Sequence, residues 1–168
     1  MPFDKIQSFL EINPEYAWLL LFLFGFMESM IITGSFMSSA ILFSICIYLY
    51  NSGILTLPWI CGFALLGSHF GDVVGFLIGK SLGPTIMATK FIQKRQKIIS
   101  RTQQFLNRFG PYTIFFGRFI PAIRPLVPFM LGISDLRLKR FYVADIFACC
   151  AWAIALALLV ISVGSIFN

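Results

Sequence analysis

The chain has 168 residues and a net charge of +6; 58% of its residues are hydrophobic and 12% are charged. A typical soluble domain is about 25% charged, so this composition, together with a mean hydropathy of +0.86, excludes a soluble globular protein. It predicts an all-α integral membrane protein that forms a single membrane domain over residues 1–168. The basic residues are clustered, which indicates membrane topology and contact with lipid headgroups, not nucleic-acid binding.

The first long apolar segment, residues 16–50, contains one charged residue, Glu28. As a single helix it would be about 52 Å long, at ~1.5 Å per residue. The hydrocarbon core of a bilayer is about 30 Å thick and takes about 20 residues, so the segment is too long for one crossing and short for two. We predict a re-entrant helical hairpin that bends at Thr33-Gly34-Ser35.

Residues 57–79 are the first predicted full span, interrupted by His69 and Asp72. A stripe of glycines stands at every fourth position, at Gly67, Gly71, Gly75, Gly79 and Gly83. Such a stripe leaves a groove along one helix face, where another backbone can approach closely. We therefore predict tight packing along Gly71, Gly75 and Gly79, although the pattern does not identify the partner.

The connector 80–108 contains seven of the 13 Lys and Arg residues and no acidic residue. The excess of positive charge places it in the cytoplasm. Apolar residues are interleaved with the basic ones, so we predict an amphipathic helix against anionic headgroups. A solvated charged face is the alternative interpretation.

The next apolar run, residues 109–134, holds two arginines, Arg118 and Arg124, and it contains Pro121, Pro125 and Pro128. An Arg near the bilayer centre costs roughly 2.5–3.5 kcal/mol on insertion scales, and a Pro within a helix removes a backbone donor. Unsatisfied backbone is tolerated at membrane depth only where protein or a water-filled cavity surrounds it. We predict a broken, inward-facing segment that presents two guanidinium groups to an anion; the alternative is a Pro-kinked helix whose arginines extend to the surface.

The last apolar run, residues 141–167, is the second predicted full span, with Asp145 near its start. A basic stretch at 137–140 precedes it, so both flanks of the Arg-containing run are predicted to be cytoplasmic and that run to be re-entrant. Residues 1–80 and 85–167 then form two repeats of opposite orientation, each with a hairpin and a transmembrane helix, and both termini face outward. A plain bundle of four spans is the alternative.

Six ionisable residues lie in the predicted membrane segments: Glu28, His69, Asp72, Arg118, Arg124 and Asp145. Such residues are costly to insert and are therefore functional candidates. We expect the two arginines to bind a phosphate, because the guanidinium fork matches it. The three acids are expected to act as counter-charges or proton carriers, and a break at Pro121 is expected to let the arginines converge. For His69 we expect a packing hydrogen bond rather than a catalytic role with Asp72, three residues away on one helix face.

Two motifs resemble the signatures of the DedA family, whose members are also called SNARE-associated or VTT-domain proteins. The first motif is Phe115-Phe116-Gly117-Arg118-Phe119-Ile120-Pro121-Ala122-Ile123-Arg124, followed by Pro128 and Gly132. The second is Gly71-Asp72-Val73-Val74-Gly75-Phe76-Leu77-Ile78-Gly79-Lys80, with Gly83. Three further positions resemble the family: it has an aromatic residue at the position of Phe141, usually an Asn at that of Asp145, and a Trp at that of Trp152. The resemblance covers about residues 16–165.

This resemblance implies a multi-pass protein of the bacterial inner membrane that moves lipids across the bilayer. We expect a flippase for a polyprenyl (undecaprenyl) phosphate carrier lipid, with membrane lipids as partners and protons as a candidate coupling ion. The sequence departs from the family at one place: the first hairpin usually carries an acid followed by Pro-Gly-Glu. Glu28 matches the first acid, but Thr33-Gly34-Ser35 replaces the rest, so the second acid is absent.

The missing acid favours an alternative, a less selective phospholipid scramblase or a membrane-homeostasis protein. We expect no enzymatic activity, no cofactor and no metal site. The four cysteines lie in apolar segments without metal-site or redox spacing, and we interpret them as small buried residues.

Overall fold

The computed structural model describes residues 2–30, 33–35, 39–94, 96–120, 123–134 and 136–164. Within these ranges the chain forms α-helices joined by short 3-10 turns (η), and no β-strand, as the composition predicts. The elements in chain order are α1 (Pro2–Ile12), η1 (Pro14–Tyr16), α2 (Ala17–Ser29), η2 (Thr33–Ser35), α3 (Ser39–Asn51), α4 (Leu57–Met87), α5 (Lys90–Gln93), α6 (Gln96–Phe109), η3 (Gly110–Tyr112), α7 (Thr113–Arg118), α8 (Leu126–Ile133) and α9 (Leu138–Gly164).

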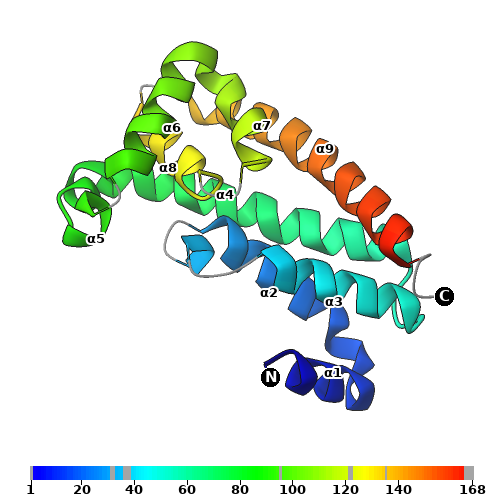
Figure 1. The fold of residues 1–168 in the computed structure, drawn as a ribbon. Coiled ribbons are helices and arrows are strands. Elements are labelled where there is room, and N and C mark those ends of the chain that lie inside the picture. Colours follow the sequence, from blue (N-terminus) through cyan, green and yellow to red (C-terminus); the bar gives the residue numbers. More distant parts are fainter. Residues whose placement is uncertain are drawn as a thin grey trace.

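Two of the described helices, α4 and α9, are long and apolar enough to cross a membrane. A third span results if α1 and α2, which meet at a bend of 116° near Asn13, are counted together. Helix α4 runs through the middle of the molecule, and α9 packs alongside it in roughly the opposite direction (Figure 1). Both long helices extend beyond the predicted spans. Helix α4 continues past residue 79 to Met87, into the predicted connector, and α9 begins at Leu138, three residues before the predicted start.

Two pairs of short helices pack against these long ones. Helices α2 and α3 have 13 residues each, or about 20 Å at ~1.5 Å per residue, and η2 lies between them at the predicted bend. Helices α7 and α8 have six and eight residues. Pro125 immediately precedes α8 and Pro128 is its third residue, where a helix has no intrahelical partner for the N–H that proline lacks.

The glycine stripe of α4 packs against two different helices. A Cβ on Gly67 would lie 2.0 Å from the carbonyl oxygen of Phe22 in α2, and one on Gly79 would lie 2.1 Å from that of Phe129 in α8. The prediction of tight packing is wrong at Gly75, which lies between these two contacts. A Cβ there would meet only the Cβ of Pro128, at an ordinary 3.6 Å. The stripe is therefore two close helix crossings separated by a looser position.

Helix α6 is amphipathic, with exposed Lys97, Arg101 and Arg108. Its apolar side is not simply turned towards lipid. Ile99 is buried and packs in a cluster with Leu126, Phe129 and Met130. The basic helix thus packs against the second short pair, at the end of the molecule away from both termini (Figure 1).

Candidate functional site

The six ionisable residues singled out by the sequence come from five parts of the chain. Glu28 lies at the end of α2, His69 and Asp72 lie in the middle of α4, and Asp145 lies in α9. Arg118 is the last residue of α7, and Arg124 lies in the turn before α8. All six are buried, with at most 8% of each residue exposed. The structure therefore brings all of them into the interior, and neither arginine extends to the surface.

Arg118 is held by two carboxylates from different helices. Its Nη2 pairs with Asp72 Oδ2 of α4 and donates to Asp145 Oδ1 of α9 at 3.0 Å. Its Nη1 donates to Ser68 Oγ at 3.0 Å. One guanidinium thus joins the second short pair to both long helices, as expected for a buried charge that must be paired.

Arg124 has a different set of partners. Its Nη1 pairs with Glu28 Oε1 of α2, and its Nη2 donates to Ser68 Oγ at 3.0 Å. The guanidinium also lies over the ring of Trp152, 4.8 Å from the ring centre. Among the described residues, Arg124 Nε and Glu28 Oε2 have no hydrogen-bond partner although both atoms are buried. This pair therefore has one donor, Arg124 Nε, and one acceptor, Glu28 Oε2, available for a ligand.

Ser68 is the residue at which the two arginines converge, and sequence reasoning missed it. Its hydroxyl accepts from Arg118 and from Arg124, and it lies 2.8 Å from Ser29 Oγ. Because an oxygen that accepts twice has its own proton left to donate, Ser29 is the natural acceptor. The signal that could have found it is the spacing, since Ser68 stands four residues before Asp72 and so shares its helix face.

His69 pairs with Asp145 of α9 and not with Asp72, with which it shares a face of α4. His69 Nδ1 lies 2.6 Å from Asp145 Oδ2, which also accepts a hydrogen bond from Cys149 Sγ at 3.6 Å. The other carboxylate oxygen of Asp145 is occupied by Arg118. The expectation of a packing hydrogen bond for His69 is confirmed, and its partner, which the sequence did not identify, is Asp145.

Ligand atoms of His69, Asp145 and Cys149 lie within 4.8 Å of one another, close enough to be considered for a metal ion. The donor set does not fit one. Asp145 already accepts from the guanidinium of Arg118, and a cation bound here would lie next to that fixed positive charge. We interpret the cluster as a hydrogen-bonded link between α4 and α9.

The breaks in the two short helix pairs lie against each other. A Cβ on Gly34, in η2, would be 3.1 Å from the Cβ of Pro125 and 2.2 Å from the carbonyl oxygen of Glu28. The residue expected to separate the arginines, Pro121, lies outside the described residues. The convergence that it was expected to allow is nevertheless observed, on Ser68.

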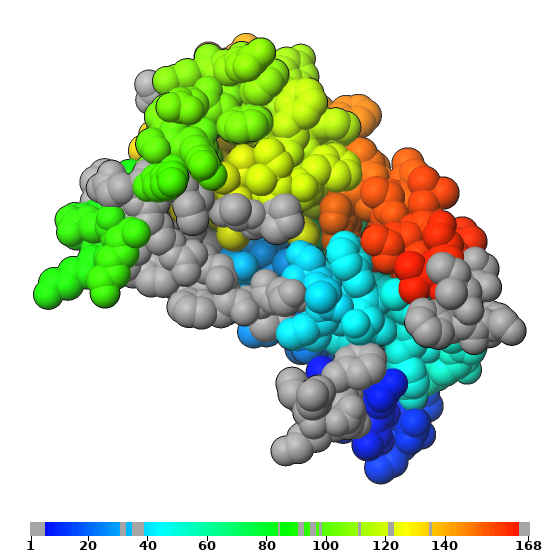
Figure 2. All heavy atoms as spheres, viewed as in Figure 1, coloured from blue at the N-terminus to red at the C-terminus, as the bar shows by residue number. Residues whose placement is uncertain are grey.

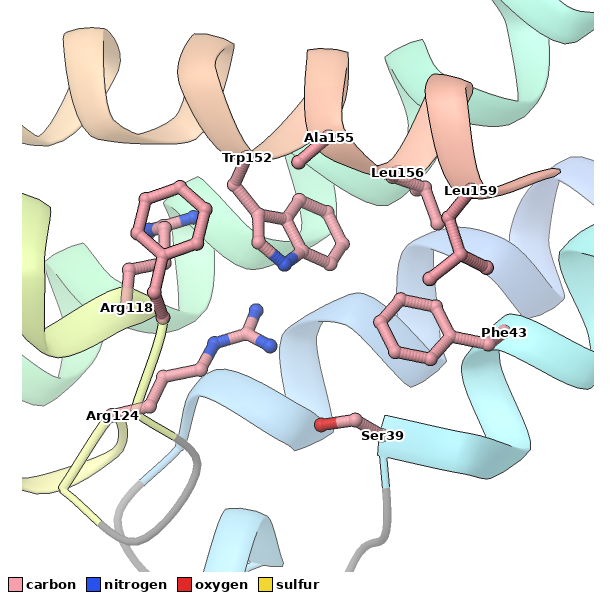
Figure 3. A pocket seen from close by; sticks show the side chains of 9 residues that line it. Ser39, Phe43, Arg118, Arg124, Trp152, Ala155, Leu156 and Leu159 are labelled. Atoms are coloured by element: carbon pink, nitrogen blue, oxygen red, sulfur yellow. The ribbon is translucent and has the colours of Figure 1, made fainter. Parts of the chain in front are cut away.

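A cavity of about 260 Å³ opens beside the two arginines. Its polar wall is formed by Arg118, Arg124 and Ser39, whose hydroxyl donates to Glu28 Oε1. Its other walls are mainly apolar: Phe43, Phe119, Trp152, Ala155, Leu156 and Leu159. Figure 3 shows the guanidinium of Arg124 pointing into this space between Trp152 and Ser39. The arrangement suits a ligand with an anionic group attached to an apolar body.

Comparisons with known proteins agree with the motifs. The chain matches the VTT domain over residues 47–162. It is 30% identical over 149 residues to an uncharacterized membrane protein of Buchnera aphidicola, covering 88% of this chain and 57% of that protein. It is 27% identical over 149 residues to the inner membrane protein YabI of Escherichia coli, covering 88% and 58%.

A relative nearer in length is the uncharacterized membrane protein YbfM of Bacillus subtilis, 22% identical over 129 residues, covering 76% of this chain and 78% of that protein. The chain spans somewhat more than half the length of the first two relatives. No solved structure matched the chain significantly. With the domain match covering residues 47–162, this membrane protein belongs to the VTT-domain (DedA) family.

Proposed function

We propose that this protein moves an anionic lipid across the bacterial inner membrane by binding its phosphate at Arg118 and Arg124. The observation that carries the proposal is the convergence of two buried guanidiniums on Ser68 Oγ, each at 3.0 Å, beside an apolar cavity. Guanidinium groups bind phosphate through paired hydrogen bonds. The family resemblance suggests a polyprenyl phosphate, undecaprenyl phosphate, as the lipid.

The size of the cavity limits how such a lipid can bind. A space of about 260 Å³ admits a phosphate and the first carbons of a chain, but it does not hold a whole polyprenyl tail. The tail must therefore remain in the bilayer while the headgroup enters. The apolar residues of α9 in the cavity wall, such as Leu156 and Leu159, provide a surface along which the chain leaves the site.

The charges of the site give a physical reason for proton coupling. Three buried carboxylates face two guanidiniums, which leaves one negative charge in excess if His69 is neutral. Burying net charge is costly, and a phosphate adds further negative charge. Uptake of a proton, by His69 or by a carboxylate such as Glu28 or Asp72, offsets that cost. This supports protons as the coupling ion.

We further propose that each short helix pair is a re-entrant hairpin and that the two pairs form an inverted repeat. Helices of about 20 Å or less are too short for a hydrocarbon core of about 30 Å. The contact between Gly34 and Pro125 supports the proposal, because it joins the breaks of the two pairs. Transporters with inverted repeats have their substrate site where such broken segments meet.

A less selective phospholipid scramblase is the second candidate. The observation that favours it is in α2, where Glu28 is the acid that pairs with Arg124 while Thr33-Gly34-Ser35 replaces the second acid that the family usually has nearby. Fewer acids leave fewer groups to carry a proton. A scramblase would move several lipids without a gradient.

Transport by the purified protein in liposomes separates these functions. We expect undecaprenyl phosphate to be moved in response to a proton gradient, and Arg118→Lys and Arg124→Lys to abolish this movement while the protein stays folded. Lys loses the bidentate fork but keeps the charge. Arg101→Lys, on the exposed side of α6, is the matched control and should transport normally.

Three results would contradict the proposal in different ways. Normal transport by both arginine variants would make the arginines structural. Gradient-independent movement of many lipids would favour the scramblase. Release of inorganic phosphate from the lipid would indicate an enzyme instead.

A further inference from the structure

A second hollow, of about 680 Å³, lies on the surface at the start of α9. It is separate from the cavity at the arginine pair, because the two share no lining residue. Its walls are Tyr112, Lys139, Arg140, Val143, Ala144 and Phe147. Nothing in the proposed transport step uses these residues.

The lining residues that belong to α9 change from charged to apolar along the helix. Lys139 and Arg140 lie in the first turn, and Val143 and Phe147 follow one and two turns later. The last two are 55% and 69% exposed, and Tyr112, from η3, is 72% exposed. One side of the hollow is therefore cationic and hydrogen-bonding, and the side further along the helix is apolar.

This change from cationic to apolar residues along α9 matches the change from headgroups to acyl chains with depth in a bilayer. Helix α9 has 27 residues and is about 40 Å long at ~1.5 Å per residue, close to the ~40–45 Å thickness of a bilayer that includes its headgroups. Its first turn, with Lys139 and Arg140, then lies among the headgroups. Phe147 lies about 12 Å further along the axis, within the acyl chains.

We propose that this hollow binds an anionic phospholipid of the leaflet in which α9 begins. The phosphate contacts Lys139 and Arg140, the Tyr112 hydroxyl donates a hydrogen bond, and an acyl chain covers Val143 and Phe147. Charge complementarity selects the anionic headgroup, because each Lys or Arg near a membrane surface is worth about 1 kcal/mol towards anionic lipid, or roughly fivefold in affinity. A zwitterionic lipid gains little there.

Figure 2 shows side chains of the segment that includes α7, in yellow-green, adjoining those of α9, in orange, at the surface. The exposure of Tyr112, Val143 and Phe147 leaves the hollow itself open at the surface of the molecule. Its occupancy does not depend on transport, so it can be tested even if the proposed function is wrong.

The test is quenching of an introduced tryptophan by brominated lipids in reconstituted vesicles. Phe147→Trp places the reporter in the apolar part of the hollow, and the three native tryptophans are subtracted by measuring the parent protein. Ile154→Trp is the matched control, because Ile154 is 64% exposed and lies seven residues further along nearly the same helix face. Brominated phosphatidylglycerol is compared with brominated phosphatidylcholine at each reporter.

We expect phosphatidylglycerol to be preferred at the Phe147→Trp reporter by at least about fivefold, with a ratio near one at the Ile154→Trp reporter. Adding Lys139→Gln and Arg140→Gln to the first variant should remove the preference. Equal ratios at the two reporters, or a preference that survives the two Gln substitutions, would overturn the proposal. Because both measurements are made without transport, neither result depends on the phosphate site at Arg118.

Discussion

Ser68→Ala is the sharpest test of the geometry of the buried site. The substitution removes the oxygen that accepts from Arg118 Nη1 and Arg124 Nη2, each at 3.0 Å. A hydrogen bond from a charged group is worth about 1.5–3 kcal/mol. Each guanidinium keeps a carboxylate partner, so we take the lower value for each of these two bonds. The substitution also removes the hydrogen bond between Ser68 and Ser29, worth about 1 kcal/mol, so we expect a loss of about 4 kcal/mol in the free energy of unfolding.

The matched control is Ser29→Ala. Ser29 contacts Ser68 Oγ at 2.8 Å, so its loss removes one hydrogen bond between neutral groups, worth about 1 kcal/mol. For a chain of this size, 1 kcal/mol corresponds to about 2–4 °C in melting temperature. We expect Ser68→Ala to lower the melting temperature by about 8–16 °C and Ser29→Ala by about 2–4 °C.

The assay is thermal unfolding of the two variants in one detergent, followed by circular dichroism. Equal shifts for the two variants would refute the reasoning, because they would show that the guanidiniums do not depend on Ser68. No shift for Ser68→Ala would refute it as well.

Two further predictions concern packing, and both are measured by the same unfolding assay. Gly79→Ala should destabilise the protein by about 1–3 kcal/mol, because the added Cβ would lie 2.1 Å from the Phe129 carbonyl oxygen. The control, Gly75→Ala, should be neutral or stabilising by up to about 1 kcal/mol. Equal losses of stability in the two variants would mean that the stripe packs uniformly. Trp152→Leu should cost about 1–2 kcal/mol more than Trp152→Phe, because only the aromatic substitute keeps a ring face under the Arg124 guanidinium, and equal costs would count against the cation–π contact.

The charged members of the site could be predicted from the sequence for an energetic reason. An Arg or an acid in an apolar segment must be paired inside the protein, so the two arginines imply acidic partners, and Glu28 and Asp72 are available in other apolar segments. The pairs Arg118–Asp72 and Arg124–Glu28 are both observed. The bend at η2 could be predicted as well, because a helix of the full segment length does not fit the bilayer.

The partner choices within the site could not be predicted in the same way. Helical spacing shows that His69 and Asp72 share a face of α4, but it does not show which neighbouring helix lies opposite that face. The pairing of His69 with Asp145 depends on how α9 packs alongside α4. The looser contact at Gly75 has the same origin, because the regular stripe in the sequence is divided between two crossing helices.

The two arginines are not equivalent in the folded protein, and this difference gives the proposed transport an order. Freeing Arg118 breaks pairs with two carboxylates, Asp72 and Asp145, whereas freeing Arg124 breaks one pair, with Glu28. Arg124 also has an unused buried donor among the described residues, and its guanidinium points into the cavity. An entering phosphate therefore displaces less by binding Arg124 first. Neutralising Glu28 with a proton removes the remaining competitor for that arginine, so under the proposed function proton uptake and the first contact with the substrate occur at the same pair of residues.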